Sequence, residues 1–401
     1  MRHRTYLTQR WLGRLGWCAA AVLVLVLGLA GVVAATRAAQ PVDHPAAGPA
    51  TGPAVPPAAP PEMDRGCDPV AEVARLPLRR RLAQLVMVGV DPRGPAQARA
   101  VVAAEQVGGI FIGGTATGLL HPGALDGVQQ VAKPPVLVAV DEEGGRVQRV
   151  DAIAGSIPSA RQMAANLTAH QVYELARRRG AVLRASGVTV DFAPIVDVSS
   201  QPDDEVIGDR SFAADPEKVI RYADAFARGL RESGVLPVFK HFPGHGRAEG
   251  DSHQGPVTTP PLAELRREDL VPYRRLLDAG AAAVMIGHLD VPGLTAPGEP
   301  ASISPPAVAL LRDEIGYHGL VISDDLGAMR AITDRVDLPE AVRQSLAAGV
   351  DMALWTSPDG LGEVLDHLEQ SVHTGTLPPA RVDEAVLRVL HAKGLDPCRP
   401  R

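Results

Sequence analysis

The chain has 401 residues, of which 46% are hydrophobic and 21% are charged, a balance typical of a globular protein. Its formal net charge of −6 at pH 7 excludes the strongly basic surface of a nucleic-acid-binding protein, so we expect no nucleic-acid partner. Aromatic residues make up only 3%, which leaves no long aromatic platform for a polymer.

Residues 1–39 have the pattern of a targeting segment. An apolar run over residues 17–35 follows four arginines: Arg2, Arg4, Arg10 and Arg14. A basic flank before an apolar run predicts export, with the run either a cleaved signal peptide or a signal anchor. Residues 40–66, rich in Pro and Ala, are expected to form an extended linker. We therefore expect a protein outside the cytoplasm, secreted or anchored, that meets the membrane only through this N-terminal segment.

The chain has three cysteines, and two of them flank the expected folded body at residues 67–401. Cys67 and Cys398 stand at its two ends, which a closed barrel would bring together. In an oxidising exterior this pair could form a disulfide; the alternative is two free thiols. Cys18 precedes the apolar run, and Trp17 stands where a lipidation site needs a small residue.

Short apolar runs alternate with amphipathic stretches along the body. Eight runs are predicted as strands: 82–90, 107–113, 135–140, 188–195, 236–239, 282–286, 320–323 and 352–355. The clearest helical stretches are 175–185, 219–233, 306–314 and 338–348. Alternation of this kind predicts a parallel sheet, and eight units predict a single (β/α)₈ barrel of the α/β class. The alternative, a doubly wound sheet, would need a glycine-rich phosphate turn after the first strand, and Gly89-Val90-Asp91-Pro92 is not one.

Polar residues follow the predicted strands where each of them ends. They are Asp141 after the third run, Asp197 after the fourth, Lys240 and His241 after the fifth, His288 after the sixth and Asp324 after the seventh. In a (β/α)₈ barrel these ends form one rim, and the active site lies there.

The densest group of chemically active side chains is Lys240-His241-Phe242-Pro243-Gly244-His245-Gly246, followed by Asp251-Ser252-His253. Proline and glycine exclude a regular helix here, so we expect these residues on a loop above the fifth strand. Asp251 and His253 are two residues apart and can meet. A carboxylate that orients an imidazole makes an acid/base for neutral pH.

Three further motifs contribute charged side chains to the same rim. In Ser323-Asp324-Asp325-Leu326, Asp324 is the better candidate for a nucleophile that faces the barrel centre, and Asp325 is expected to be a helix N-cap. Residues 141–149 combine carboxylates, two glycines and two arginines, which suits the binding of sugar hydroxyls. Residues 208–212 contain Arg210, which is either a binding residue or a surface ion-pair partner.

Taken together, these motifs resemble glycoside hydrolase family 3, and within it the single-domain bacterial β-N-acetylhexosaminidases that process peptidoglycan. The resemblance covers residues 76–390, and the loop with Asp251-Ser252-His253 is its most specific part. It implies that Asp324 is the nucleophile and that His253, paired with Asp251, is the acid/base. It also implies that five residues hold the N-acetylglucosamine: Asp141, Arg149, Arg210, Lys240 and His241.

This resemblance implies a retaining exo-β-N-acetylglucosaminidase that acts through a covalent glycosyl-enzyme. We expect no cofactor, a monomer, and glycans or muropeptides containing N-acetylglucosamine as partners. One alternative is a phosphorylase, because an imidazole acid/base does not repel phosphate. A second is a metal-dependent hydrolase with ligands among His241, His245, His253, His288 and Asp324. A third is a sugar-binding barrel without activity.

Overall fold

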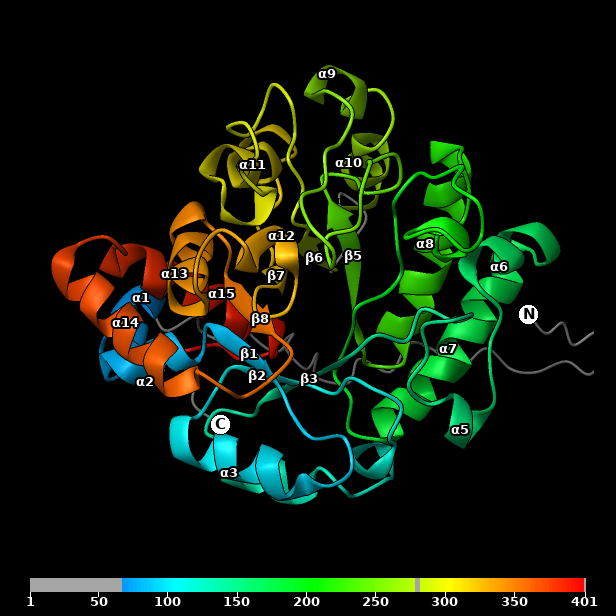
Figure 1. The fold of residues 1–401 in the computed structure, drawn as a ribbon. Helices are drawn as coiled ribbons and strands as arrows, with labels where there is room; N and C mark the ends of the chain where they lie inside the picture. The colour runs from blue at the N-terminus through cyan, green and yellow to red at the C-terminus, as the bar shows by residue number, and fades with distance from the viewer. Residues whose placement is uncertain (1–66, 278–281, 400–401) are drawn as a thin grey trace, which may run out of the picture. The chain divides into compact units, whose positions relative to one another are not determined.

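The computed structural model describes residues 67–277 and 282–399, so the expected targeting segment and linker lie outside the described residues. Eight parallel strands close into a barrel in chain order, and helices surround it (Figure 1). This confirms the predicted (β/α)₈ barrel and excludes the doubly wound sheet. The strands are β1 (Val86–Gly89), β2 (Gly109–Phe111), β3 (Leu137–Val140), β4 (Val190–Asp191), β5 (Leu236–Phe242), β6 (Ala283–Ile286), β7 (Val321–Asp325) and β8 (Met352–Trp355).

Seven of the eight strands differ from their predicted bounds at one end or both, and only β8 has the bounds that the sequence indicated. Leu82 was expected in the first strand but belongs to the preceding helix, because one apolar run continues from a buried helix into β1 and periodicity cannot separate the two. β4 ends early: Pro194 has no backbone N–H to donate to a ladder. β5 and β7 extend further than expected, which carries Lys240, His241 and Asp324 inside strands.

Several helices begin after a residue whose side chain accepts a hydrogen bond from the first turn. In the helix over residues 338–348, which matches the prediction, Asp337 accepts a hydrogen bond from the Glu340 amide, and Gly349 ends the helix with a φ of 115°. The helices are α1 (Pro69–Ala74), α2 (Leu78–Ala83), α3 (Pro95–Glu105), α4 (Asp126–Val131), α5 (Asp151–Ala154), α6 (Ala160–Asn166), α7 (Ala169–Ala185), α8 (Pro216–Glu232), α9 (Leu262–Leu265), α10 (Leu270–Leu277), α11 (Pro305–Ala309), α12 (Arg330–Thr333), α13 (Leu338–Ala348), α14 (Leu361–Thr374) and α15 (Pro379–Ala392).

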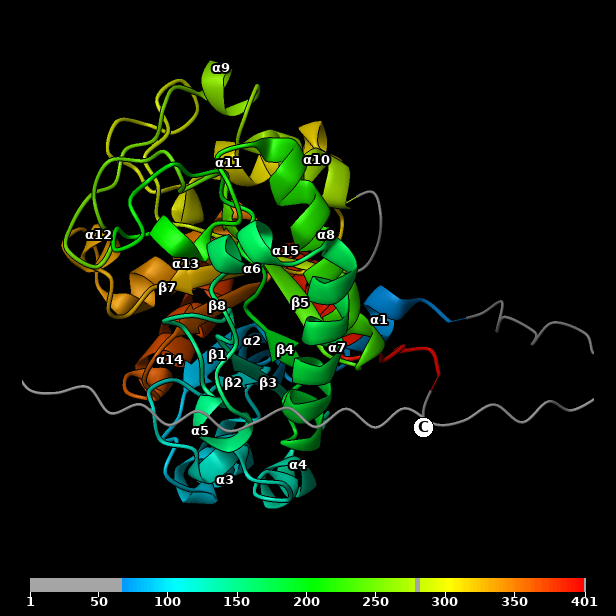
Figure 2. The same ribbon diagram turned by 90° about the vertical axis from the view of Figure 1, so that its right-hand side faces the viewer.

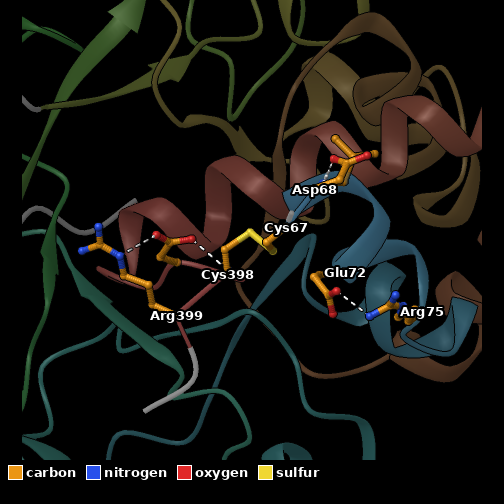
Figure 3. The surroundings of a disulfide bond; sticks show 8 residues. Cys67, Asp68, Glu72, Arg75, Cys398 and Arg399 are labelled. Atoms are coloured by element: carbon orange, nitrogen blue, oxygen red, sulfur yellow. Dashed lines mark hydrogen bonds and ion pairs between the residues drawn. A yellow bond between two sulfur atoms is a disulfide. The ribbon is translucent and has the colours of Figure 1, made fainter. Parts of the chain in front are cut away.

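The two ends of the described body meet at the amino-terminal pole of the barrel. α1 packs against α15, and the Lys393 ammonium donates to Gln84, which lies two residues before β1. The sulfur atoms of Cys67 and Cys398 are bonded, with their Cα atoms 5.8 Å apart (Figure 3). In Figure 2, α1 lies on one side of the barrel and α12, which follows β7, lies on the other. The disulfide therefore closes the pole away from the carboxyl ends of the strands.

Within residues 67–277 and 282–399, no helix combines the length and the apolar character needed to cross a bilayer.

Candidate active site

A cavity of about 490 Å³ opens at the carboxyl ends of the strands, within the size range of small-molecule sites. All but one of the site residues predicted from the sequence line it: Asp141, Arg149, Arg210, Lys240, His241, His253 and Asp324. The exception, Asp251, lies behind His253 and is hydrogen-bonded to it. The structure therefore brings together side chains from β5 and β7 and from the segments that follow β3, β4 and β5.

Two adjacent glycines let the chain turn sharply after β3 and place the carboxylates of that loop. Gly144 and Gly145 have φ values of 94° and 57°, which side-chain-bearing residues rarely adopt. A Cβ atom on Gly144 would also lie 2.3 Å from the Pro158 carbonyl oxygen. The turn directs Asp141 and Glu143 toward β5.

A network of buried charges forms one wall of the cavity. The Lys240 ammonium lies 2.7 Å from Asp141 and 2.6 Å from Glu143. Arg210 donates two hydrogen bonds to Glu143, at 2.8 and 2.9 Å, and Arg149 lies 3.8 Å from Asp141. Arg210 is thus a partner in this buried network and not in a surface ion pair.

These partners hold the network in its charged form. Burial alone would raise the pKa of Glu143, but the charges of Arg210 and Lys240 outweigh it and keep that pKa below its usual range. Burial alone would lower the pKa of Lys240, but Asp141 and Glu143 outweigh it and raise that pKa. The wall therefore presents fixed charges that can bind sugar hydroxyls.

The placement of Lys240 and His241 corrects the sequence prediction. Both were expected on a loop above the fifth strand, but both lie within β5, and only the residues after Phe242 leave the strand. The isolated bridge between Ile195 and Lys240 continues the pairing of β5 with the segment after β4. Side chains that belong to a strand are held more rigidly than side chains of a loop.

Asp324 lies near the end of β7 and is buried, with 9% of its surface exposed in the cavity. Its Oδ1 atom accepts a hydrogen bond from the Asp325 amide at 2.9 Å. Burial alone would raise the pKa of Asp324, but the imidazoles of His241 and His288, together with this amide, outweigh it and lower that pKa. Asp324 is therefore an available anion at neutral pH.

Asp325 is not the helix N-cap that the sequence suggested. It belongs to β7, and the next helix, α12, begins five residues later with Met329 as its N-cap. The Asp325 carboxylate instead accepts hydrogen bonds from the Gly327 amide and the Thr356 hydroxyl, at 2.8 and 2.7 Å. These bonds connect the end of β7 to the segment after β8 and support the strand that carries Asp324.

Asp251 and His253 form the expected pair on the loop between β5 and α9. Oδ1 of Asp251 accepts the His253 amide and lies 3.0 Å from its Nδ1 atom, while Oδ2 accepts the Gln254 side chain at 2.9 Å. Because an ionised carboxylate can only accept, Nδ1 of His253 carries a proton and Nε2 is left for the cavity. The Ala331 amide of α12 donates to the Ser252 carbonyl oxygen, which ties this loop to the segment after β7.

Three residues contribute to the site although no individual role in sugar binding or glycosyl transfer was predicted for them from the sequence. Glu143 is the centre of the charge network, Asp197 accepts hydrogen bonds from His241 and His245, and His288 lies 2.8 Å from the Asp325 carbonyl oxygen. In the sequence, Glu143 lay within the 141–149 motif, His288 was considered as a metal ligand, and Asp197 only followed a predicted strand. Such a position indicates the rim of the barrel but not a particular contact.

Among residues 67–277 and 282–399, no group of three or more His, Cys, Asp or Glu side chains is arranged to hold a metal ion. Three of the four histidines considered as ligands have other contacts, and one of these is His253, which pairs with Asp251. His288 lies 2.7 Å from the Ser302 hydroxyl, and His241 lies 2.8 Å from Asp197. The arrangement offers an ionised carboxylate, an imidazole with a carboxylate partner, and a charged wall, which is a set suited to glycosyl transfer.

Comparison with known proteins gives the same assignment. The family model described as the glycosyl hydrolase family 3 N terminal domain matches residues 77–392. The chain is 52% identical to the beta-hexosaminidase LpqI of Mycobacterium tuberculosis over 341 residues, which are 83% of this chain and 87% of that protein. The solved structure of M. tuberculosis LpqI matches with a TM-score of 0.79 at 51% identity, covering 83% of this chain and 98% of that one.

A more distant solved structure has the same barrel. It is a glycoside hydrolase family 3 beta-N-acetylglucosaminidase from Paenibacillus sp. str. FPU-7, with a TM-score of 0.75 and 33% identity. The match covers 80% of this chain and 62% of that one. The resemblance read from the motifs is confirmed: the chain belongs to glycosyl hydrolase family 3 and is a glycoside hydrolase.

Proposed function

We propose that the chain is a retaining exo-β-N-acetylglucosaminidase that releases N-acetylglucosamine from peptidoglycan fragments or related glycosides. The observation that carries this proposal is the Asp324 carboxylate, ionised and buried in a cavity that His253 also lines. Relatives that cover most of the chain are named as beta-hexosaminidases, and the Paenibacillus structure as a beta-N-acetylglucosaminidase.

In the first step, an Asp324 oxygen attacks the anomeric carbon and the bond from that carbon to the leaving oxygen breaks. His253 donates the proton from Nε2 to the leaving oxygen, while Asp251 stabilises the ring through Nδ1. The product of this step is a glycosyl ester on Asp324 and a free aglycone.

In the second step, water attacks the anomeric carbon of this ester. His253, now neutral, takes a proton from the water, the bond between the sugar and Asp324 breaks, and the carboxylate returns. Two inversions at one carbon give net retention. The His253 side chain is 65% exposed, so its proton exchanges readily with solvent between turnovers.

The charged wall holds the sugar during both steps. Asp141 and Lys240 together offer acceptors and donors to neighbouring hydroxyls, and Arg149 extends the same surface. Arg210 contributes through its two bonds to Glu143, which keep the guanidinium plane fixed. Hydrogen bonds from charged groups strengthen as the sugar ring develops positive charge and its hydroxyls become more acidic.

Peptidoglycan fragments are the proposed source of the sugar because the N-terminal residues have the pattern of an export segment. An exported barrel would meet cell-wall material. Digestion of purified muropeptides, with the released sugar identified by chromatography, tests this part. Release from simple glycosides but from no muropeptide would restrict the proposal to smaller substrates.

The decisive experiment is trapping of the covalent intermediate. A slow, fluorinated N-acetylglucosamine substrate should leave one hexosamine adduct, and peptide fragmentation should assign it to Asp324 rather than to the neighbouring Asp325. Asp324→Ala should give no adduct and lose at least roughly 10³-fold in kcat, because the covalent route is removed.

Three outcomes would contradict the proposal. An adduct on another residue would remove Asp324 from its role. Undiminished turnover by Asp324→Ala on a chromogenic N-acetylglucosaminide would do the same. A sugar phosphate formed in place of the free sugar, when phosphate is supplied, would make the enzyme a phosphorylase.

A further inference from the structure

Asp197 connects three parts of the active site although its own side chain is fully buried. The Val196 amide donates to the Lys240 carbonyl oxygen at 2.9 Å, which keeps this segment beside β5. Oδ2 of Asp197 lies 2.8 Å from Nδ1 of His241, and Oδ1 accepts the His245 amide at 2.7 Å. The Asp197 carbonyl oxygen accepts the Ser211 hydroxyl at 2.7 Å, next to Arg210.

These contacts determine which nitrogen of His241 faces the cavity. Burial alone would raise the pKa of Asp197, but His241, together with the His245 amide, outweighs it and lowers that pKa, so Asp197 is ionised. An ionised carboxylate only accepts hydrogen bonds, so Nδ1 of His241 must be the protonated nitrogen of this contact. Nε2 is then left for the cavity, whose wall His241 helps to form.

The same ring also acts on the nucleophile. His241 is the first of the groups that lower the pKa of Asp324, so its orientation affects the carboxylate that attacks the sugar. Asp197 itself is not among the residues that line the cavity. The Asp197 carboxylate can therefore influence the reaction through His241 and through the turn that contains His245.

We infer that Asp197 is a positioning residue for glycosyl transfer, which holds His241 with Nε2 toward the sugar, in the cavity that Asp324 also lines. The cavity then contains two carboxylate–imidazole pairs with different tasks. Asp251–His253 moves protons to and from the leaving oxygen, while Asp197–His241 aligns the sugar and supports the nucleophile. The kinetic part of this inference rests on the proposed function, whereas the pairing rests on the contacts alone.

The test is a double-mutant cycle with Asp197→Asn and His241→Gln. Asparagine has the same size but offers one oxygen to three N–H groups, the His241 amide, the His241 ring and the His245 amide, so its NH₂ group must face a donor. Losing a charge-assisted hydrogen bond should lower kcat/KM roughly 10- to 100-fold in the wild-type background. In the His241→Gln background the same change should cost less than about threefold, because two residues that act as one unit are not additive.

Asp269→Asn is the matched control. Asp269 is also a buried carboxylate, its Cβ atom packs against Gly244 of the same turn, and its partner is Arg247, not His241. Its effect on kcat/KM should be the same factor in both backgrounds. Equal losses from Asp197→Asn in both backgrounds would mean that Asp197 only supports the fold, and would overturn the inference.

A second readout does not depend on activity or on the folding of Asp197→Asn. In ¹⁵N-labelled wild-type enzyme, the ring signals of His241 can be identified by their absence in His241→Gln. They should show the Nδ1-protonated form, and a proton resident on Nε2 with bare Nδ1 would overturn the pairing. Wild-type enzyme that fails to turn over any N-acetylglucosaminide would refute the proposed function, and the spectrum would still decide the pairing.

Discussion

Glu143→Gln is the substitution that best tests how the active-site wall is held together. The wild-type carboxylate forms an ion pair with Lys240 and accepts two hydrogen bonds from Arg210, and its side chain is 3% exposed. Glutamine keeps the shape but removes the charge and replaces one acceptor by a donor. One of the two buried cations must then face an amide NH₂ group.

The expected loss follows from the burial of the partners. Breaking a buried ion pair by removing one side costs about 3–5 kcal/mol, because the remaining charge is left without compensation. With an unfolding entropy of about 2.1 cal/mol/K per residue, a body of about 330 residues loses roughly 0.7 kcal/mol per degree near its midpoint. The melting temperature should therefore fall by about 4–7 °C.

Differential scanning calorimetry at neutral pH measures this loss. The matched control is Glu174→Gln on α7, whose partner Arg177 lies at 3.0 Å but in solvent, so its Tm should change by only about 1 °C. Because the pKa of Glu143 is lowered, its stabilisation is complete above the ordinary carboxyl value of about 4.3 and is lost as the pH falls below it. Equal shifts for Glu143→Gln and Glu174→Gln, or a difference that is unchanged at pH 3, would refute the reasoning.

Three further outcomes are expected. Because the pKa of Asp324 is lowered, kcat/KM should fall on the acid side of its pH profile only below the ordinary aspartate pKa of about 3.9. A fall that sets in above this pH would contradict an ionised nucleophile. Arg210→Lys keeps the charge but not the two parallel hydrogen bonds to Glu143, so steady-state kinetics should show roughly a tenfold lower kcat/KM. An unchanged kcat/KM would show that these two bonds do not contribute to sugar binding. Replacing Cys67 and Cys398 by serine should destabilise the fold by up to about 5 kcal/mol. It should leave kcat unaltered, because the bridge lies at the pole away from the cavity. An unchanged Tm would show that the disulfide does not stabilise the fold.

The chain order of strands and helices was predictable because each depends on a local pattern. The helix α13 and the strand β8 lie where the apolar periodicity placed them, since caps and burial are both set within a few residues. Boundaries failed where one apolar run served two elements, as at Leu82. The rim position of Asp324 was also predictable, because in a parallel barrel every strand ends at the same face.

The sequence by itself determined the barrel class, the family and the side chains that gather at one rim, because periodicity and motif spacing are properties of neighbouring residues. Only the tertiary structure decided which charges pair. Glu143 meets Arg210 across 67 residues, and Asp197 meets His241 across 44. Such pairs depend on the register of the closed sheet and on the paths of the loops, which no local pattern encodes. The same register brings Asp325 into a strand, where a local reading expected a helix cap.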